Sequence, residues 1–392
     1  MREYPDPFAP AQLGPLELRN RMIKAATFEG MTGGQAVSDR LVEFHRRMAA
    51  GGVGLTTVAF CAVSEDGAST PNELVLTDAS IPGLAKVAEA VHAEGAAISA
   101  QMGHAGAVAA SAGIPAMGPS RLFSPLAMKW TKEATPADLS RIVGNFAAGA
   151  RRLQEAGFDA VEVHLGHGYL PSEFLSPKLN RRKDAWGGSL ENRARFPRAI
   201  AEGVKEAVGD QMAVVAKLNM SDGAPGGLWV DESIEVARML ESDGTIDALE
   251  LTGGSSLQSP MYMFRGEAPL EELGKSMPRA VAFGLKLFGR FVFKTYPFEE
   301  AFFRSYARQF RDALSMPLIL LGGINRRDTI EEAMADGFDF VAMGRGLLRD
   351  PDLVNQMIKG EREASLCVHC NKCMASIYAG THCVLVPEEQ RV

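Results

Sequence analysis

Residues 156–161 read Ala-Gly-Phe-Asp-Ala-Val, and residues 336–341 read Asp-Gly-Phe-Asp-Phe-Val. In both copies a helical segment ends at a glycine and runs at once into a short apolar strand. Looser copies occur at residues 51–55 and 244–249. Glycine suits the left-handed residue that closes a helix, and a strand that is apolar throughout is typical of a sheet covered on both faces. The repeat therefore predicts alternating strands and helices.

Eight apolar segments qualify as strands of this repeat. They are residues 22–26, 55–60, 97–102, 160–164, 213–218, 248–251, 318–321 and 340–343. Segments of helical period lie between them, and the clearest begins at Thr135, with Pro136 at its first helical position. Eight such units favour a closed (β/α)8 TIM barrel, an α/β fold, with an open doubly wound sheet as the alternative.

Two regions depart from the repeat. The segment at about 253–316, after the sixth strand, is much longer than one crossover needs, and it contains an aromatic and basic run at 283–296. We interpret it as an insertion, either a lid that shapes the substrate site or an ordinary surface subdomain. We expect a barrel over residues 1–360 and a short cysteine-rich tail over residues 361–392.

Composition narrows the possible functions. The 392 residues are 46% hydrophobic and 23% charged, which is enough to bury a large core. The net charge of −7, without a basic stripe, argues against nucleic-acid binding. No apolar stretch approaches the roughly 20 residues of a membrane-spanning helix, and residues 1–10 lack the blocks of a signal peptide. We expect a cytoplasmic protein that acts on a small molecule and has no nucleic-acid or membrane partner. A homo-oligomer is possible.

Active sites of such barrels lie at the carboxyl ends of the strands. Five of the eight predicted strands end in residues suited to chemistry or ligand contact: Gln101, His164, Lys217, Gly322 with Gly323, and Gly344 with Arg345. Glycine loops after the last two strands let backbone amides approach an anion closely, and they are the usual phosphate site of this fold. We therefore predict a phosphate site there, with the Arg345 side chain as a further donor. Ordinary turns are the alternative.

The densest group of polar residues follows the fourth strand. His164 and His167 are three residues apart, and Tyr169 comes two residues later. Metal binding is disfavoured because no third histidine or carboxylate falls at a matching strand end. We predict that both histidines donate hydrogen bonds to a carbonyl or another oxyanion, and that Tyr169 delivers a proton. Structural histidines of the core are the alternative.

The same region resembles the signature of the old yellow enzyme family of flavin-dependent NAD(P)H oxidoreductases. Residues 164–177 read His-Leu-Gly-His-Gly-Tyr-Leu-Pro-Ser-Glu-Phe-Leu-Ser-Pro, and residues 180–193 continue the match with Asn-Arg at the start and Gly-Gly-Ser-Leu-Glu-Asn-Arg at the end. Residues 20–21, 101–106 and 342–351 fit as well, so the resemblance covers most of the chain.

The resemblance implies a barrel that holds FMN non-covalently. Gln101 would bind the polar edge of the flavin, and Lys217, where the family usually has arginine, would place a cation near flavin N1 and the C2 carbonyl. Phe28 stands where many relatives carry a flavin-contacting cysteine or threonine, so the redox potential does not follow from the family. The other implied FMN contacts are Ala25, Ala26, Thr27, His164, Gly322, Gly323, Gly344 and Arg345.

The implied activity takes hydride from NADH or NADPH and reduces the activated C=C bond of an unsaturated carbonyl or enoyl compound. His164 and His167 would hold the carbonyl oxygen, and Tyr169 or solvent would supply the proton. One alternative is an oxidative dehydrogenase or demethylase whose electrons leave through an iron–sulfur cluster in the tail. Another is a non-catalytic flavin or electron carrier, but a carrier has no need of an oxyanion site.

Four of the five cysteines lie in the tail: Cys367, Cys370, Cys373 and Cys383. Crowded thiols without an export signal favour reduced cysteines or a metal site over disulfides. The sequence around Cys367 and Cys370 resembles the iron–sulfur region of the 2,4-dienoyl-CoA reductase and trimethylamine dehydrogenase branch, although the third and fourth cysteines are spaced differently. A [4Fe-4S] cluster, zinc and metal-free thiols all stay open. That branch also has a second nucleotide-binding half, which we do not expect in this chain.

Overall fold

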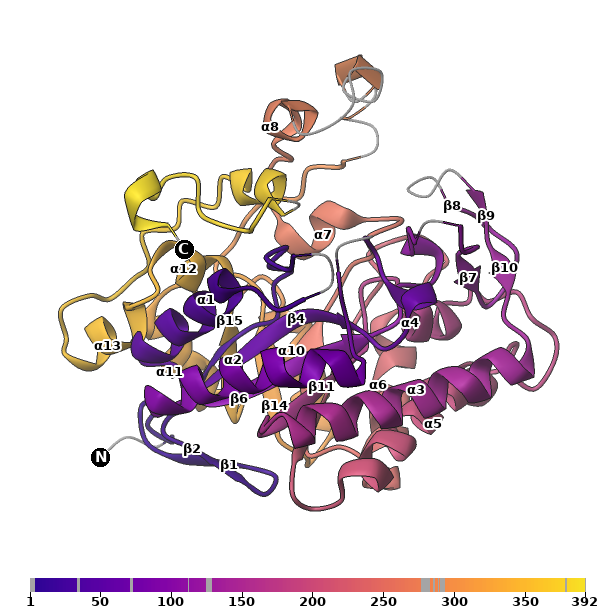
Figure 1. Ribbon diagram of the computed structural model, residues 1–392, viewed down its shortest axis with the longest axis horizontal. Helices are drawn as coiled ribbons and strands as arrows, with labels where there is room; N and C mark the ends of the chain where they lie inside the picture. Colours follow the sequence, from indigo (N-terminus) through magenta and orange to yellow (C-terminus); the bar gives the residue numbers. More distant parts are fainter. Residues whose placement is uncertain are drawn as a thin grey trace.

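The computed structural model describes residues 4–391 except residues 34–35, 71–72, 112, 125–128, 276–282, 285, 288, 290–292 and 378. Eight parallel strands form its centre (Figure 1): β3 (Met22–Lys24), β4 (Leu55–Ala62), β6 (Ala97–Gly103), β11 (Ala160–Leu165), β12 (Ala213–Asn219), β13 (Ala248–Thr252), β14 (Leu318–Leu321) and β15 (Phe340–Met343). Each pairs with its neighbour in the chain order, and β15 returns to pair with β3. The predicted (β/α)8 barrel is therefore confirmed, and the open sheet is excluded.

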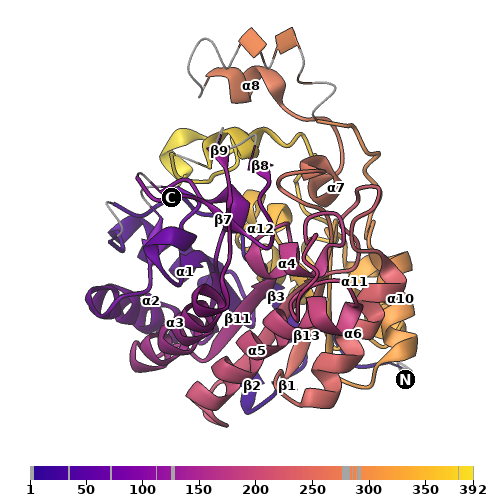
Figure 2. The ribbon, with the colours of Figure 1, turned by 90° about the vertical axis from the view of Figure 1, so that its right-hand side faces the viewer.

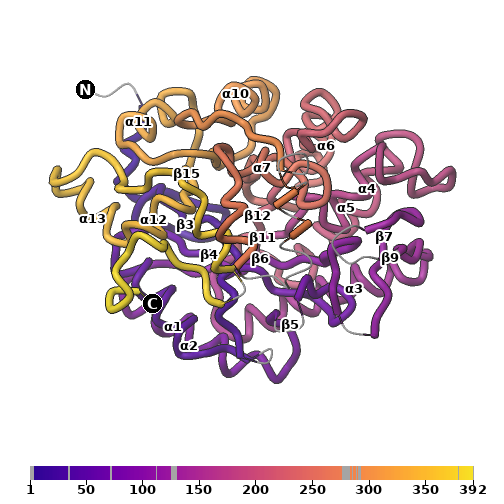
Figure 3. The backbone as a smooth tube through the Cα atoms, turned by 90° about the horizontal axis from the view of Figure 1, so that it is seen from above, coloured from indigo at the N-terminus to yellow at the C-terminus, as the bar shows by residue number. Residues whose placement is uncertain are grey.

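Helices surround this barrel on all sides, as the view from above shows (Figure 3). They are α1 (Asp39–Ala50), α2 (Ile81–Ala93), α3 (Pro136–Glu155), α5 (Leu190–Val208), α6 (Val230–Asp243), α10 (Arg304–Ala313), α11 (Arg327–Ala335), α12 (Arg345–Arg349) and α13 (Leu353–Ile358). Helix α3 begins as predicted: the Thr135 side chain accepts a hydrogen bond from the Asp138 backbone N–H, and Pro136 occupies the first turn.

Strand side chains alternate between an outer and an inner core. Outward residues such as Val161 and Val163 pack against the helices, whereas Ala160 and Phe340 face the barrel interior. The hairpin of β1 (Ala11–Leu13) and β2 (Leu16–Leu18) adds its leucines to the inner core at the amino-terminal end of the barrel. Apolar residues therefore fill that end, and the inward positions near the other end are left for polar groups.

Shorter elements extend the loops at the carboxyl ends of the strands. They are β5 (Leu74–Val75), β7 (Met117–Gly118), β8 (Phe123–Ser124), β9 (Lys129–Trp130), β10 (Lys132–Glu133), α4 (Leu170–Leu175), α7 (Pro260–Phe264), α8 (Leu270–Lys275), and the 3-10 turns Glu65–Gly67, Asp78–Ser80, Gly106–Val108, Lys372–Ser376 and Glu388–Gln390. Among the described residues, no helix combines the length and the apolar character that crossing a bilayer requires.

The segment predicted as an insertion has two parts. Its last helix, α10, packs against α6 and β14, as a crossover helix of the barrel does. Helix α8, in the middle part of this segment, stands away from the barrel beside the tail (Figure 2). There the Lys372 ammonium lies 2.8 Å from the Glu272 carboxylate. Part of the run at 283–296 lies outside the described residues, and the choice between a lid and a surface subdomain stays a prediction.

Candidate active site

The structure brings the predicted strand-end residues to one mouth of the barrel. Gln101 lies in β6, His164 in β11 and Lys217 in β12, and His164 is directly opposite Lys217 in the strand pairing. Gly322 follows β14 and Gly344 follows β15. Because all eight strands are parallel and the barrel is closed, their carboxyl ends share one face. The histidines and the glycine loops therefore open onto the same space.

Three aromatic rings meet at the end of β11. The ring centroids of His164 and His167 are 4.9 Å apart, and those of His164 and Tyr169 are also 4.9 Å apart. His167 has a left-handed backbone, with φ of 60°. This conformation is held by Asn219, whose side-chain oxygen accepts from the His167 backbone N–H at 3.0 Å. The predicted catalytic trio is thus a single contact group, although its chemical roles stay predictions.

Both histidines are neutral at ordinary pH. Burial lowers the pKa of His167 to about 3, helped by the positive charge of Lys217. Burial, His167 and Lys217 together hold the pKa of His164 well below its usual range. A ring nitrogen of His167, Nε2, is 2.9 Å from the Thr252 hydroxyl, and the buried Nδ1 of His164 has no hydrogen-bond partner within the described structure. A neutral imidazole carries one N–H donor, so the pair suits an uncharged oxygen acceptor.

Lys217 is held inside the barrel by two carboxylates. Its ammonium lies 2.8 Å from Glu162 and 3.0 Å from Glu250, and all three side chains are at most 3% exposed. Gln101 donates to the same Glu162 oxygen at 2.5 Å. Burial lowers the pKa of Lys217, but the two carboxylates outweigh it, and the pKa ends above its ordinary value. Lys217 is therefore a fixed cation, and one of its three N–H donors is left for a ligand.

Sequence reasoning assigned no role to Glu162 or Glu250. A signal was present, since each carboxylate interrupts an otherwise apolar strand two residues before an inward polar residue, His164 or Thr252. The period of two places such a pair on the same face. Burial raises the pKa of Glu250 to about 8, with Lys217 acting in the opposite direction.

The glycine loops after β14 and β15 are closely covered by other segments. A Cβ on Gly322 would come within 2.6 Å of the Phe303 ring, and one on Gly323 within 2.6 Å of the Phe302 ring. Both glycines have positive φ, 114° and 76°. The loops thus need glycine for close packing as well as for any phosphate, and their phosphate role stays a prediction.

The Arg345 side chain makes hydrogen bonds to segments other than the glycine loops. Its guanidinium donates to the Phe264 carbonyl oxygen at 2.7 Å and to the Asn371 side-chain oxygen. The side chain thereby joins the segment after β13 to the tail. Only its position beside Gly344 corresponds to the predicted phosphate contact.

The segment after β3 lies next to Tyr169. Ala25 is buried and its backbone N–H donates to the Met343 carbonyl, which fixes it beside β15. The Thr27 hydroxyl accepts a hydrogen bond from buried Lys24 at 2.8 Å. Ala26 and Phe28 pack into the same apolar cluster as Tyr169. Residues 25–28 therefore form one wall of the mouth.

These residues fit FMN. An unpartnered buried imidazole nitrogen on His164, a spare donor on Lys217 and the small side chains of Ala25 and Ala26 border one mouth. When bound, FMN supplies hydride transfer, which amino-acid side chains do not provide. Lys217 and Gln101 would hold its polar edge.

The four tail cysteines are half-buried, and no disulfide joins them in the described structure. Burial raises the pKa of Cys373 to about 11, and it raises the pKa of Cys367 as well. Within the described part of the chain, no three or more His, Cys, Asp or Glu side chains are arranged to hold a metal ion. The described side chains therefore do not distinguish between a cluster, zinc and metal-free thiols.

Comparison with known proteins identifies the class. A family model described as the NADH:flavin oxidoreductase / NADH oxidase family matches residues 6–251. A 4,4'-dithiodibutanoate disulfide reductase of Rhodococcus erythropolis is 55% identical over 97% of this chain and 95% of its own length. A metal reductase of Desulforamulus reducens is 34% identical over 95% of this chain, which spans only 52% of that protein.

Solved structures agree with these relatives. A 2-naphthoyl-CoA reductase has a TM-score of 0.84 at 27% identity, over 99% of this chain and 57% of that one. Morphinone reductase has a TM-score of 0.72 at 25% identity over 93% of both chains. The chain belongs to the NADH:flavin oxidoreductase / NADH oxidase family, as its resemblance to old yellow enzymes predicted. It is an oxidoreductase of a family that uses FMN and NADH or NADPH.

Proposed function

We propose that this protein uses NADH or NADPH, through bound FMN, to reduce the activated C=C bond of a small unsaturated carbonyl compound. The observation that supports this proposal is the contact group of His164, His167 and Tyr169 at the mouth of the barrel. Two neutral, buried imidazoles side by side suit a carbonyl oxygen that gains negative charge as a hydride adds to the conjugated carbon.

In this proposal each side chain has a separate task. His164 and His167 hold the carbonyl oxygen by N–H donors, and their low pKa values prevent a competing positive charge. Asn219 and Thr252 orient His167 from its backbone and its ring. The phenol of Tyr169, packed on His164, supplies the proton to the second carbon of the alkene. Lys217 provides the fixed positive charge next to the cofactor.

The double variant His164→Ala with His167→Ala tests this proposal. We expect turnover of 2-cyclohexenone with NADPH to fall by about 10² or more, since one oxyanion donor alone is worth that much. Bound FMN and thermal stability should stay close to wild type. His92→Ala is the matched control, because His92 is 43% exposed and pairs with Asp159 away from the mouth. Unchanged turnover in the double variant would contradict the assigned role.

Reduction of a small disulfide is a second candidate. It is favoured by the 55% identical relative that is named for this reaction. In the balanced reaction NADH gives a hydride equivalent, two electrons and one proton, and solvent gives a second proton; the S–S bond breaks and two thiols and NAD+ are formed. Parallel assays with 2-cyclohexenone and 4,4'-dithiodibutanoate separate the two candidates. Reduction of the disulfide alone, with the same rate in the double histidine variant, would replace the first proposal.

The state of the tail cysteines is a separate proposal. An iron–sulfur cluster, zinc or free thiols are distinguished by metal analysis of protein purified without oxygen, together with absorbance beyond the flavin bands. Reduced thiols and the use of NAD(P)H both favour a cytoplasmic location, which we also propose.

A further inference from the structure

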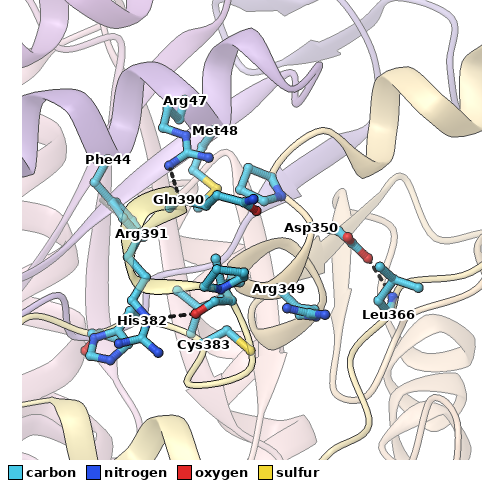
Figure 4. Close-up of a pocket in the computed structure, with 15 residues that line it drawn as sticks. Phe44, Arg47, Met48, Arg349, Asp350, Leu366, His382, Cys383, Gln390 and Arg391 are labelled. Carbon is cyan, nitrogen blue, oxygen red and sulfur yellow. Dashed lines mark hydrogen bonds between the residues drawn. The ribbon is translucent and has the colours of Figure 1, made fainter.

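A cavity of about 240 Å³ lies between α1, α12 and the tail (Figure 4). Phe44 and Met48 of α1, Arg349 at the end of α12, and Cys383 and Arg391 of the tail contribute to its walls. None of the residues that we assign to the FMN and substrate site lines it. The cavity is therefore separate from the barrel mouth, and its size suits an occupant smaller than a typical drug-sized ligand.

The cavity carries an excess of positive charge. Arg47, Arg349 and Arg391 face it from three different segments, whereas Asp350 is its single carboxylate. Arg47 donates to the Gln390 carbonyl, and Arg391 donates to the carbonyls of the tail backbone. Within the described residues these three arginines have no carboxylate partner within 4.0 Å. The Nε of Arg349 is buried and has no hydrogen-bond partner in the described structure.

The single carboxylate does not neutralise this charge. One Asp350 oxygen accepts hydrogen bonds from the Leu366 backbone N–H at 2.6 Å and from the Ser365 hydroxyl at 3.2 Å. Its other oxygen lies 3.7 Å from Arg362. Arg349 is partly exposed and lines the cavity, so the accessible end of its guanidinium can donate a charge-assisted hydrogen bond to an anion that enters.

One part of the remaining wall is apolar. Phe44, Met48, Leu348 and Val386 line the cavity beside the arginines. Inorganic phosphate would leave this wall without contacts, and an alkane or alcohol would leave Arg349 unpaired. A carboxylate with a short aliphatic chain satisfies both halves, because guanidinium groups match the planar carboxylate and the chain covers the apolar side chains.

We propose that this cavity is a binding site for a short aliphatic carboxylate, recognised by Arg349 and the apolar wall of α1. The site is independent of the proposed reaction, because it shares no residue with the barrel mouth. A bound acid would lie against the tail beside Cys383, and would stabilise the packing of the tail on α1 and α12 by mass action.

Calorimetric titration of the FMN-loaded protein tests the site. Butyrate is the probe, and 1-butanol and inorganic phosphate are the matched probes that lack the charge or the chain. We expect butyrate to bind with a dissociation constant of about 20 mM or lower. 1-Butanol and phosphate should bind about tenfold or more weakly, because the first lacks the charge and the second lacks the aliphatic chain. Absence of butyrate binding, or tighter binding of phosphate, would overturn the proposal.

Variants place the binding in this cavity. Arg349→Met keeps most of the aliphatic stem and should weaken butyrate binding by about tenfold or more. If Arg349→Met fails to fold, Arg47→Met serves as the test variant in its place. The control is Arg238→Met, at an exposed arginine that already pairs with Glu235 on α6. Butyrate should leave the flavin absorbance unchanged and should still bind the double histidine variant. A shifted flavin spectrum with lost binding in that variant would place butyrate in the barrel mouth and reject the tail site.

Discussion

The buried charges of the barrel mouth and the partly exposed charges of the tail cavity are paired in opposite ways. At the mouth, the Lys217 ammonium lies between two carboxylates, all three nearly inaccessible to water. Around the cavity, three arginines lack a carboxylate partner within the described residues, and one guanidinium nitrogen is buried without a hydrogen bond. The mouth is thus complete in its charges before any ligand arrives, whereas the cavity is completed only by an anion. The difference indicates a preorganised reaction site and a binding site that responds to its ligand.

Removal of the Lys217 charge should have the largest effect. Lys217→Met leaves Glu162 and Glu250 buried without their cation, and loss of one partner of a buried ion pair costs about 3–5 kcal/mol in the free energy of unfolding. Urea unfolding of the FMN-free protein at pH 8 measures it. The deficit should shrink below about pH 8, where Glu250 holds a proton and loses less by the removal of the cation. Lys217→Arg, which keeps the charge, is the control, and a loss below about 1 kcal/mol in Lys217→Met would show that the charges are not tightly coupled.

The fold was predictable because its signals are local. Glycines such as Gly157 and Gly337 end the preceding helices, and the strands that follow are apolar on both faces. The start of α3 followed from the Thr135 cap. The strands β7 to β10 have only two residues each, so they carry no periodicity that a sequence can show.

The site was predictable only in part. Strand ends indicated His164 and Lys217, because parallel strands deliver their last residues to one mouth. The grouping of Glu162 and Glu250 around Lys217 depends on the register in which neighbouring strands pair. This register cannot be read from the sequence alone. The contacts of Arg345 depend on residues 81 positions before it and 26 after it in the chain. Such long-range contacts have no local signal.

A tail variant should have a smaller and local effect. Asn371 is 1% exposed, donates to the carbonyls of Arg265 and Glu267 at 2.6 and 3.0 Å, and accepts from Arg345. Asn371→Ala should cost about 1–3 kcal/mol, because it leaves buried groups unpaired. Hydrogen exchange should quicken in residues 361–391 and near α8, but remain unchanged in β11 to β13. Equal quickening in the barrel strands would mean that tail and barrel unfold together.

The stability of the protein should also depend on pH through Glu250. Burial raises the pKa of Glu250 to about 8, against 4.5 for the ordinary carboxyl group. In the folded protein the group keeps its proton up to about pH 8, while in the unfolded chain it loses the proton above about pH 4.5. The unfolded state therefore binds fewer protons in this window, and wild-type stability falls as pH rises from 4.5 to 8.

Glu250→Gln removes this titration and keeps the shape of the side chain. The free energy of unfolding of the variant, minus that of wild type, should increase as pH rises from 4.5 to 8 and then level off. Urea unfolding of FMN-free protein at a series of pH values measures the difference. The matched control is Glu43→Gln, at a carboxylate whose pKa is lowered by its hydrogen bond with Arg46; its difference should not rise in that window. A flat difference for Glu250→Gln would mean that Lys217 keeps both carboxylates ionised, so the mouth would carry a net negative charge next to the cofactor.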